Sequence, residues 1–549
     1  MDKRIEERNF TKYGFNMNLF VSVTSGVFIL IFALYALLQL DRANKLLQSI
    51  NSAILTNFDW VFILSSNIFL LICIGLALSK LGNVRIGGID SVPEFSKIAW
   101  YSMLISAGMG IGLMFWAVGE PLTHFINAPP IFESADPAVS ALASTFLHWG
   151  LHPWGIYTLI GLGLAYFAFN RKLPLSIRSV FYPFLKDKIY GIHGDIIDTF
   201  AVLATMFGLA TSLGLGTLQI NSGLDYIFNI GVSTGIQVGI IIVVTLLATA
   251  SVMAGIHKGV RFLSEVNMRI AFVFMMLIFL LGPTTYILRL FVNSIGVYFG
   301  NIVQYATFLS TTGDSNWQGA WTIFYLAWWI SWSPFVGMFI ARISKGRTIR
   351  EFIVGVLFIP SLISFFWLSV FGGSAIFVDG LSGGSLFQTV QDNYPVALFE
   401  MINLLNIPLA AEAVKLALFV LITLLVMTFF ITSSDSGSLV VNKLTSSGVL
   451  GAPKRQRVFW ALLEGVLAAT LLIIGGELAL ETLQTAVIIA GLPLAVVLFF
   501  MSFSLIKGIG ETYEDQHKIR KKDEFWGIIN ELGLDVPVGD LEVDEDQEK

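Results

Sequence analysis

Residues 327–350 read AWWISWSPFVGMFIARISKGRTIR, and this stretch decides how the rest of the chain is interpreted. It begins as an apolar segment, yet Trp328, Trp329 and Trp332 lie in its middle rather than at its ends. Tryptophan normally sits at the membrane interface, and Pro334 predicts a break in the helix. Irregular backbone at membrane depth needs cover from protein or a cavity, and aromatic faces attract cations. We therefore interpret the stretch as one wall of a cation site, with plain packing aromatics as the alternative.

Composition places the chain in a membrane. It has 549 residues, of which 55% are hydrophobic and 13% are charged, and no long stretch between the apolar runs reads as a separate domain. These values are typical of a polytopic membrane protein. The single cysteine, Cys73, excludes an intramolecular disulfide framework. No small-residue cleavage pattern follows the first apolar run, so we expect a retained first helix rather than a signal peptide.

Apolar runs of about 20 residues predict an all-α protein with twelve transmembrane helices. The runs cover residues 17–38, 60–81, 98–118, 139–169, 196–230, 233–255, 267–288, 319–341, 350–372, 408–433, 457–475 and 482–506. Lysines and arginines gather before the first run and after each even-numbered run up to the tenth, whereas loops such as 120–137 carry almost none. By the positive-inside rule, both termini are expected in the cytoplasm of a cell-membrane protein.

The predicted organisation has a core flanked by two leading helices and a soluble tail. The acidic run 540–548 near the end of the tail is expected to be solvated. The predicted parts are a cytoplasmic N-terminus (1–16), two leading helices (17–97), a core (98–506) in two halves (98–290 and 319–506) with an external amphipathic segment between them (291–312), and a cytoplasmic tail (507–549).

The third and eighth runs are interrupted in the same way. The third contains SAGMGIG at residues 106–112, and its glycines Gly108, Gly110 and Gly112 weaken the helix. The eighth contains the tryptophans and the proline described above. Interrupted segments at corresponding places in two inverted halves indicate a transporter binding site at the midplane, although glycines at this spacing can also form a helix-packing face.

The fourth run contributes HWGLHPWGIY at residues 148–157. Pro153 is expected to distort the helix, so that Trp149, Trp154 and Tyr157 turn toward one cavity. Several rings around one cation would supply several kcal/mol. Such a site suits a small, permanently charged solute without any buried carboxylate.

The tenth run ends in FFITSSDSGS at residues 429–438. Thr432 and Ser433 place two hydroxyls side by side, and loosened backbone in the third run could add carbonyl oxygens. A neutral cage of oxygen atoms suits sodium. The alternative is that both hydroxyls bond back to their own helix. Asp435 follows and could cap the helix or pair with a basic loop.

Five stretches resemble the betaine/choline/carnitine transporter family. They are WTIFYLAWWISWSPFVGMFIARISKGRTIREFI (321–353), SAGMGIGLMFWAVGEPLTHF (106–125), HWGLHPWGIY (148–157), SLGLGTLQI (212–220) and TFFITSSDSGS (428–438). The resemblance implies the LeuT-like fold, in which spans 3–7 and 8–12 form an inverted five-helix repeat behind two leading helices. It also implies a homotrimer.

The resemblance assigns roles to residues of both sites. It implies an aromatic box of Trp149, Trp154, Tyr157 and Trp329. Residues beside the box, in the pathway or near the rest of the solute, would be Trp328, Trp332, Gly108, Met109, Gly110 and Gly112. The sodium site would use Ser106, Met109, Phe429, Thr432 and Ser433.

The chain departs from the family pattern at three places. The family's second sodium site would use Thr205 and Phe335, but Leu209 stands where a second hydroxyl belongs, so this site is expected to be weakened or absent. Choline-type members carry an aspartate where this chain has Gly112, and glycine fits a zwitterion better. Sodium-independent exchangers place an arginine where this chain has Asn267.

The sequence therefore predicts a transporter rather than an enzyme. We expect sodium symport of a trimethylammonium solute, most simply glycine betaine, by alternating access, with sodium as coupling ion and no other cofactor. A sodium-independent exchanger of carnitine or betaine, proton-coupled choline uptake and a channel are the alternatives. A hydrolase using Ser433 or Ser434 is disfavoured, because no histidine shares their span. The acidic tail lacks the long basic segment linked to osmotic sensing in some members.

Overall fold

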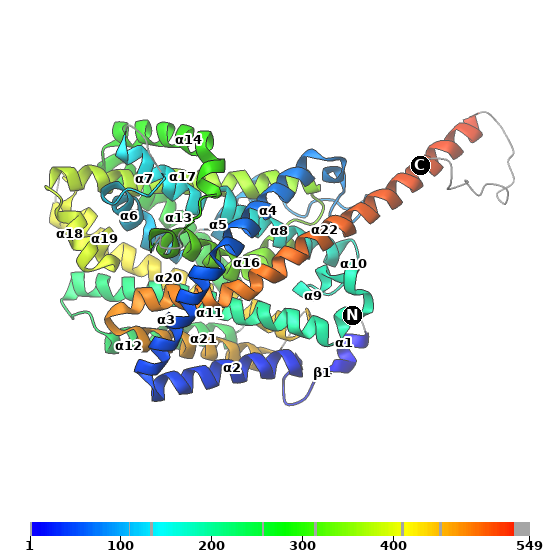
Figure 1. The fold of residues 1–549 in the computed structure, drawn as a ribbon, viewed down its shortest axis with the longest axis horizontal. Helices are drawn as coiled ribbons and strands as arrows, with labels where there is room; N and C mark the ends of the chain where they lie inside the picture. The colour runs from blue at the N-terminus through cyan, green and yellow to red at the C-terminus, as the bar shows by residue number, and fades with distance from the viewer. Residues whose placement is uncertain are drawn as a thin grey trace.

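A computed structural model describes residues 3–108, 110–131, 136–254, 257–311, 316–407, 411–449 and 453–531. The fold is helical throughout this part of the chain, apart from one short antiparallel strand pair, so the expected all-α class is confirmed. Met109 and the acidic run 540–548 lie outside the described residues. Figure 1 shows the helices gathered into one body, from which the C-terminal helix projects.

The N-terminal part holds two leading apolar helices with a third helix between them. Gln39 and Phe58 each lie between consecutive helices, so α2, α3 and α4 follow one another closely. The middle helix, α3, was not predicted, because its 18 residues are too polar on average to read as a span. The elements are α1 (Lys3–Arg8), β1 (Asn9–Phe10), β2 (Met17–Asn18), α2 (Leu19–Leu38), α3 (Leu40–Asn57), α4 (Asp59–Leu78) and η1 (Lys80–Asn83).

The first half of the core contains two interrupted spans. The two helices of the third span are bent by 66° at the glycine segment, as predicted. Its elements are α5 (Lys97–Gly108), α6 (Ile111–Ile126), α7 (Pro137–Trp149), α8 (Leu151–Phe169), α9 (Ile177–Val180), α10 (Tyr182–Leu185), η2 (Lys186–Tyr190), α11 (Ile192–Phe228), α12 (Thr234–Ala254), α13 (His257–Leu281) and α14 (Thr284–Ala306).

The second half begins with a π-helical turn and ends in a 53-residue helix. That last helix, α22, is the one that projects from the body in Figure 1. The elements are α15 (Asn316–Gln318), the π turn η3 (Gly319–Ile323), α16 (Phe324–Ile343), α17 (Ile349–Leu381), α18 (Ser385–Asp392), η4 (Tyr394–Val396), α19 (Ala397–Leu404), α20 (Ala411–Thr445), α21 (Lys454–Gly475), η5 (Gly476–Leu478) and α22 (Ala479–Glu531).

Among the described residues, ten helices are long and apolar enough to cross a membrane, or eleven when the bent pair α5 and α6 counts as one span. This measure does not confirm the predicted count of twelve. The fourth predicted span is divided at Gly150, and α21 and α22 merge into one run. Helix α14 is among the ten by composition, and it lies along one edge of the molecule (Figure 1).

Helix packing is reciprocal between the two halves. Helix α6, from the third predicted span, packs on α17 from the ninth, and α16 from the eighth packs on α8 from the fourth. Likewise α11 packs on α22, and α20 packs on α13. If each span of the first half is exchanged with the span five places further on, the contact of α6 with α17 becomes that of α16 with α8. In the same way, the contact of α11 with α22 becomes that of α20 with α13. Two inverted repeats would produce this pattern.

Two expected helix breaks are placed wrongly by the sequence. Helix α16 runs unbroken through Pro334, because the Ser333 hydroxyl donates to the Ile330 carbonyl (2.7 Å) that the proline leaves without a backbone donor. The irregular backbone is the π turn before it. In the fourth span the break falls at Gly150 and not at Pro153, which lies in the first turn of α8. A Cβ at Gly150 would lie 2.5 Å from the Phe146 carbonyl oxygen.

Candidate functional site

The four residues of the predicted aromatic box lie together. The Trp149 and Trp329 ring centroids are 4.9 Å apart, Tyr157 lies 6.1 Å from Trp329, and Trp154 lies 5.5 Å from Tyr157. All four side chains are buried. Helices α7 and α8 therefore supply three rings and α16 the fourth. Rings at these separations could surround one cation, since each acts within about 6 Å of its centroid.

The other two tryptophans of α16 differ in position. Trp328 stacks on Trp329 at 4.9 Å and donates its indole N–H to the Ser212 hydroxyl of α11 (3.2 Å). Trp332 lies one turn further on and donates to the Gly208 carbonyl (2.9 Å). Trp328 thus adjoins the box, whereas Trp332 belongs to the interface of α16 with α11.

Gly112 brings the glycine segment against the box. A Cβ at this position would lie 2.8 Å from the Trp328 ring and 3.1 Å from the Trp149 ring. An aspartate here would displace both rings. Gly110 has no such neighbour and serves as the N-cap of α6, in extended backbone. Gly108 ends α5, and the bend of the span falls between Ser106 and Ile111.

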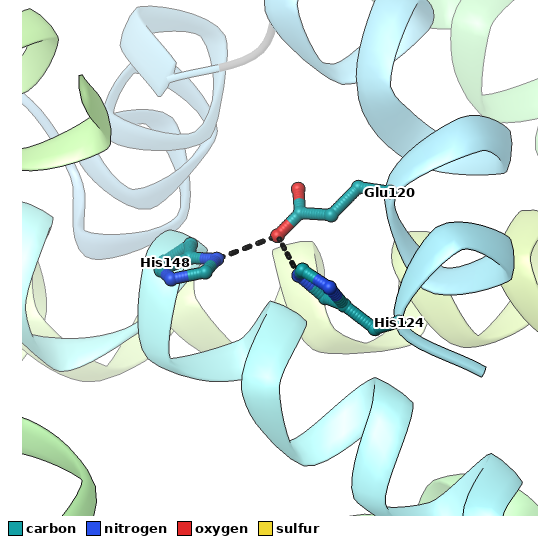
Figure 2. Close-up of side chains that lie close together, drawn as sticks. All are labelled: Glu120, His124 and His148. Atoms are coloured by element: carbon teal, nitrogen blue, oxygen red, sulfur yellow. Dashed lines mark hydrogen bonds and ion pairs between the residues drawn. The ribbon is translucent and has the colours of Figure 1, made fainter. Parts of the chain in front are cut away.

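A buried carboxylate lies behind the box. Glu120 accepts hydrogen bonds from the Trp149 indole (2.8 Å) and the Tyr325 hydroxyl (2.5 Å) on one oxygen. The other oxygen contacts His148 Nδ1 (2.7 Å), and His124 Nε2 lies 3.6 Å from it (Figure 2). The expectation of a site without a buried carboxylate is therefore wrong. Residue 120 is not in a loop, because α6 continues past Pro121 to Ile126.

The histidines complete this network. Because a carboxylate only accepts, His148 Nδ1 carries a proton, and its Nε2 faces the Thr322 hydroxyl (3.0 Å). One atom each from Glu120, His124 and His148 lies within 4.8 Å of the others, so the three could hold a metal ion. The oxygens of Glu120 and both nitrogens of His148 already have hydrogen-bonding neighbours, which favours a network that holds the box. Trp329 also joins it, donating to the His148 carbonyl (2.8 Å).

Sequence reasoning missed Glu120, His148 and Tyr325 as site residues. The signal was present, because an ionisable residue inside an apolar segment is a functional candidate by default. The predicted third span ends at residue 118, which leaves Glu120 in the following loop. Tyr325 stacks on both His148 (4.9 Å) and Trp329 (5.9 Å).

The predicted sodium ligands lie on two segments that both contact α11. A Cβ at Gly216 of α11 would lie 3.0 Å from Ile111 at the start of α6 and 3.4 Å from Phe430 of α20. Helices α6 and α20 also contact each other. Ser106 lies in the last turn of α5, and Met109 is outside the described residues.

The hydroxyl pair of α20 is Thr432 and Ser433. Thr432 Oγ1 lies 3.0 Å from the Thr428 carbonyl and 3.1 Å from the Phe429 carbonyl, as the alternative interpretation expected. A hydroxyl that donates its proton in this way keeps its lone pairs, so it can still ligate a cation. The geometry is therefore compatible with both readings.

The second predicted sodium site falls at the interface of α11 with α16. The Thr205 hydroxyl donates to the Ala201 carbonyl (2.6 Å), and Leu209 packs over Gly437 of α20, where a Cβ would lie 2.6 Å from it. Phe335 lies on α16 beside Trp332 (5.1 Å). Ser331, which sequence reasoning missed, faces Gly208 here and is buried with no partner for its hydroxyl among the described residues.

Comparison with known proteins decides the family. The model of the betaine/carnitine/choline transporter family matches residues 20–514. The chain belongs to this family. It is similar to glycine betaine transporter 1 of Vibrio parahaemolyticus, with 44% identity over 92% of this chain and 97% of the relative.

Two further family members from Vibrio parahaemolyticus are similar over most of their length. A glycine betaine/proline/choline/ectoine transporter is 42% identical over 92% of this chain and 90% of its own. A glycine betaine/proline/choline transporter is 40% identical over 93% of this chain and 94% of its own. The chain is thus a transporter of the betaine, choline and carnitine type, an integral membrane protein and not an enzyme, as the resemblance implied.

Proposed function

We propose that this transporter imports glycine betaine by sodium symport through alternating access. The observation that carries the solute class is the buried box, in which four rings contact one another in series and Trp149 donates to the Glu120 carboxylate. Ring faces and a nearby carboxylate both favour a permanent cation. The names of the three relatives above, which all include glycine betaine, support the choice within this class.

Gly112 supports a zwitterion over choline. Choline is a cation without a carboxylate, so an additional anion beside the box would favour it. This chain leaves no space for one, because even a Cβ at this position would clash with two box-side rings. Binding of glycine betaine needs no such anion, since the solute carries its own carboxylate.

Sodium coupling is supported by the surroundings of α20. The hydroxyl pair Thr432 and Ser433 supplies neutral oxygen ligands that suit sodium. Sodium-independent exchangers of the family are expected to have arginine at the position of Asn267. In this chain Asn267 is buried on α13, which packs on α20. Arg269, two residues on, is exposed, whereas Asn267 is buried. A neutral side chain in that place leaves room for a cation.

One sodium ion is enough for the proposed function. Each ion entering down 100 mV contributes about 2.3 kcal/mol, and a tenfold gradient adds about 1.4 kcal/mol. Together they support accumulation of several hundredfold. We place the protein in the cell membrane with both termini in the cytoplasm, on the basis of its basic loops.

The deciding experiment is uptake of labelled glycine betaine into proteoliposomes, with and without an inward sodium gradient. Accumulation that requires sodium supports symport. Uptake that ignores sodium and rises when unlabelled betaine or carnitine is preloaded would replace symport with exchange. Absence of any betaine uptake, with retained binding of another trimethylammonium solute, would change the solute and keep the site.

A further inference from the structure

A second buried carboxyl lies far from the aromatic box, in the middle of α21. Glu464 has no exposed surface, and neither of its oxygens has a hydrogen-bond partner among the described residues. The hydroxyl of Ser434, on α20, lies within interaction range of this carboxyl, but the two groups do not reach the geometry of a formed hydrogen bond. Glu120 is equally buried but accepts from several donors, so the two acids are in opposite situations.

No positive charge is available to Glu464. Arg457, two turns away on the same helix, already pairs with the Asp435 carboxylate (2.9 Å) and donates to the Asp435 carbonyl (2.7 Å). An ionised carboxylate without a donor or a counter-ion is very unfavourable in a membrane interior. The carboxyl of Glu464 therefore carries a proton in this structure.

The helices around α21 bring few other titratable groups. Residues 234–254 of α12 and 199–224 of α11 contain none, and α2 contains only Tyr35. Helix α20 contributes Asp435 and Lys443, whereas its Glu412 and Lys415 lie at its opposite end. Helix α3 meets α21 at Ile474, which is about 15 Å further along the helix than Glu464 at a rise of 1.5 Å per residue. The charges of α3, and Glu481 at the start of α22, are at that distant end.

Buried polar residues connect Glu464 with one end of α20. Every fourth residue from Ser434 to the end of α20, and the residue directly after the helix, is polar and buried; these residues are Ser434, Ser438, Asn442 and Ser446. The facing residues of α21 bond to this stripe: Arg457 to Ser438 (3.4 Å), and Gln456 to Ser446 (3.0 Å). Ser446 in turn donates to the Asn16 carbonyl of the N-terminal segment (2.7 Å).

On the other side of Ser434, toward the start of α20, the residues at the same spacing are apolar. Continuing by fours from Ser434 toward the start of α20 gives Phe430, Val426 and Ile422, all with no exposed surface. Water and protons are favoured by polar side chains and excluded by such an apolar run. The buried polar residues therefore form a path from the N-terminal segment to Ser434, and Glu464 lies at the inner end of this path.

From this geometry we propose that Glu464 is a proton-binding site of the transport cycle, which exchanges its proton along the Ser434–Ser446 stripe with the solution at the N-terminal end of the molecule. Helix α20 also carries the Thr432 and Ser433 pair, so movement of this one helix would act on both. The inference requires a transporter, which the family provides, and does not depend on sodium symport or on the choice of glycine betaine.

The first test is independent of any solute. Dicyclohexylcarbodiimide modifies protonated carboxyls within membranes, and mass spectrometry locates the modified residue. We expect the purified full chain to be labelled at Glu464 at acidic pH, falling by up to about tenfold per pH unit once the carboxyl titrates. Glu120, saturated by donors, is the internal control and should stay unlabelled. Absence of label on Glu464 with the reagent active on a reference membrane carboxyl would overturn the proposal.

The second test measures protons during transport. Proteoliposomes containing a trapped pH dye are expected to acidify when betaine enters through the wild type, and Glu464→Gln should abolish this signal while betaine binding stays unchanged. Glutamine is neutral and of the same size, so folding should be retained. Equal proton movement in both proteins, or none in a wild type that takes up betaine, would overturn the proposal. If betaine is not transported at all, the proposed solute fails, and the labelling result still decides Glu464.

Discussion

The surroundings of the aromatic box and the region between α20 and α21 differ in how completely their buried polar groups are hydrogen-bonded. Around the aromatic box, the hydrogen-bonding groups of Glu120, His148 and Trp149 are satisfied by protein alone, and His124 Nε2 is the atom of this cluster that has no hydrogen-bond partner among the described residues. Around α20 and α21, the Ser434 hydroxyl and both Glu464 oxygens have no partner among the described residues. Both regions are buried, so burial does not explain the difference.

The difference indicates how each region works. A box whose rings are fixed before the solute arrives loses little side-chain freedom on binding, which favours affinity. Polar groups left unpartnered at membrane depth are unfavourable by several kcal/mol unless an ion, a proton or a moving helix satisfies them. The box is therefore expected to define the solute, and the α20 region to respond to ions.

The largest expected effect comes from removing the central ring. Trp329 contacts Trp149, Tyr157, Tyr325 and Trp328, so Trp329→Ala should cost about 2 kcal/mol of binding, or about thirtyfold in betaine affinity. Calorimetry in detergent measures the affinity, and thermal unfolding checks that the variant is folded. Trp329→Phe retains an aromatic face and should lose less. Wild-type affinity in the alanine variant would move the solute site away from α16.

A smaller effect is expected when the hydroxyl pair of α20 is removed. Changing Thr432 and Ser433 together to alanine should raise the sodium concentration for half-maximal uptake by about tenfold, because two ligands at roughly 0.7 kcal/mol each are lost. Uptake against sodium concentration measures this shift, with betaine affinity in saturating sodium as the control. An unchanged sodium requirement would mean that both hydroxyls serve only their own helix, and the ion region would lose its assigned role.

Neutralising the acid behind the box should affect charged solutes selectively. Glu120→Gln keeps the size of the side chain and removes its charge, so affinity for glycine betaine should fall by about fivefold, or about 1 kcal/mol. The matched ligand is 3,3-dimethylbutyrate, in which carbon replaces the ammonium nitrogen. Its competition with labelled betaine should be almost unaffected. Equal losses for both ligands would show that Glu120 only positions Trp149 and contributes no electrostatic preference.

Much of this arrangement could be predicted from the sequence. Twin interrupted segments five spans apart indicated where the solute site lies, and the spacing of Trp149, Trp154 and Tyr157 indicated that these rings turn toward one cavity. These features are local, because helix periodicity and glycine content decide them. The family resemblance then supplied roles for the rings that periodicity alone does not give.

The misses have a common physical cause, which is compensation by distant side chains. Glu120–Pro121 looks like the end of a helix, but donors from α7 and α16 make a buried carboxylate acceptable there. Pro334 looks like a break, but Ser333 satisfies the freed carbonyl. Glu464 lies in an apolar run of the sequence, and only the packed structure shows that no described donor reaches its carboxyl with hydrogen-bond geometry.

The smallest expected functional effect tests whether the ion region can be completed at Leu209. Leu209→Thr would place a hydroxyl one turn from Thr205, on the side that faces α20, and should make sodium dependence somewhat steeper while betaine affinity stays unchanged. Because Leu209 fills the space over Gly437, the change should also lower stability by about 1–3 kcal/mol. The control Leu209→Ala creates the cavity without a hydroxyl and should reproduce the loss of stability alone. If both variants show the same sodium dependence, the second predicted sodium site holds no ion, and the Thr432 and Ser433 pair of α20 is left as the candidate sodium site.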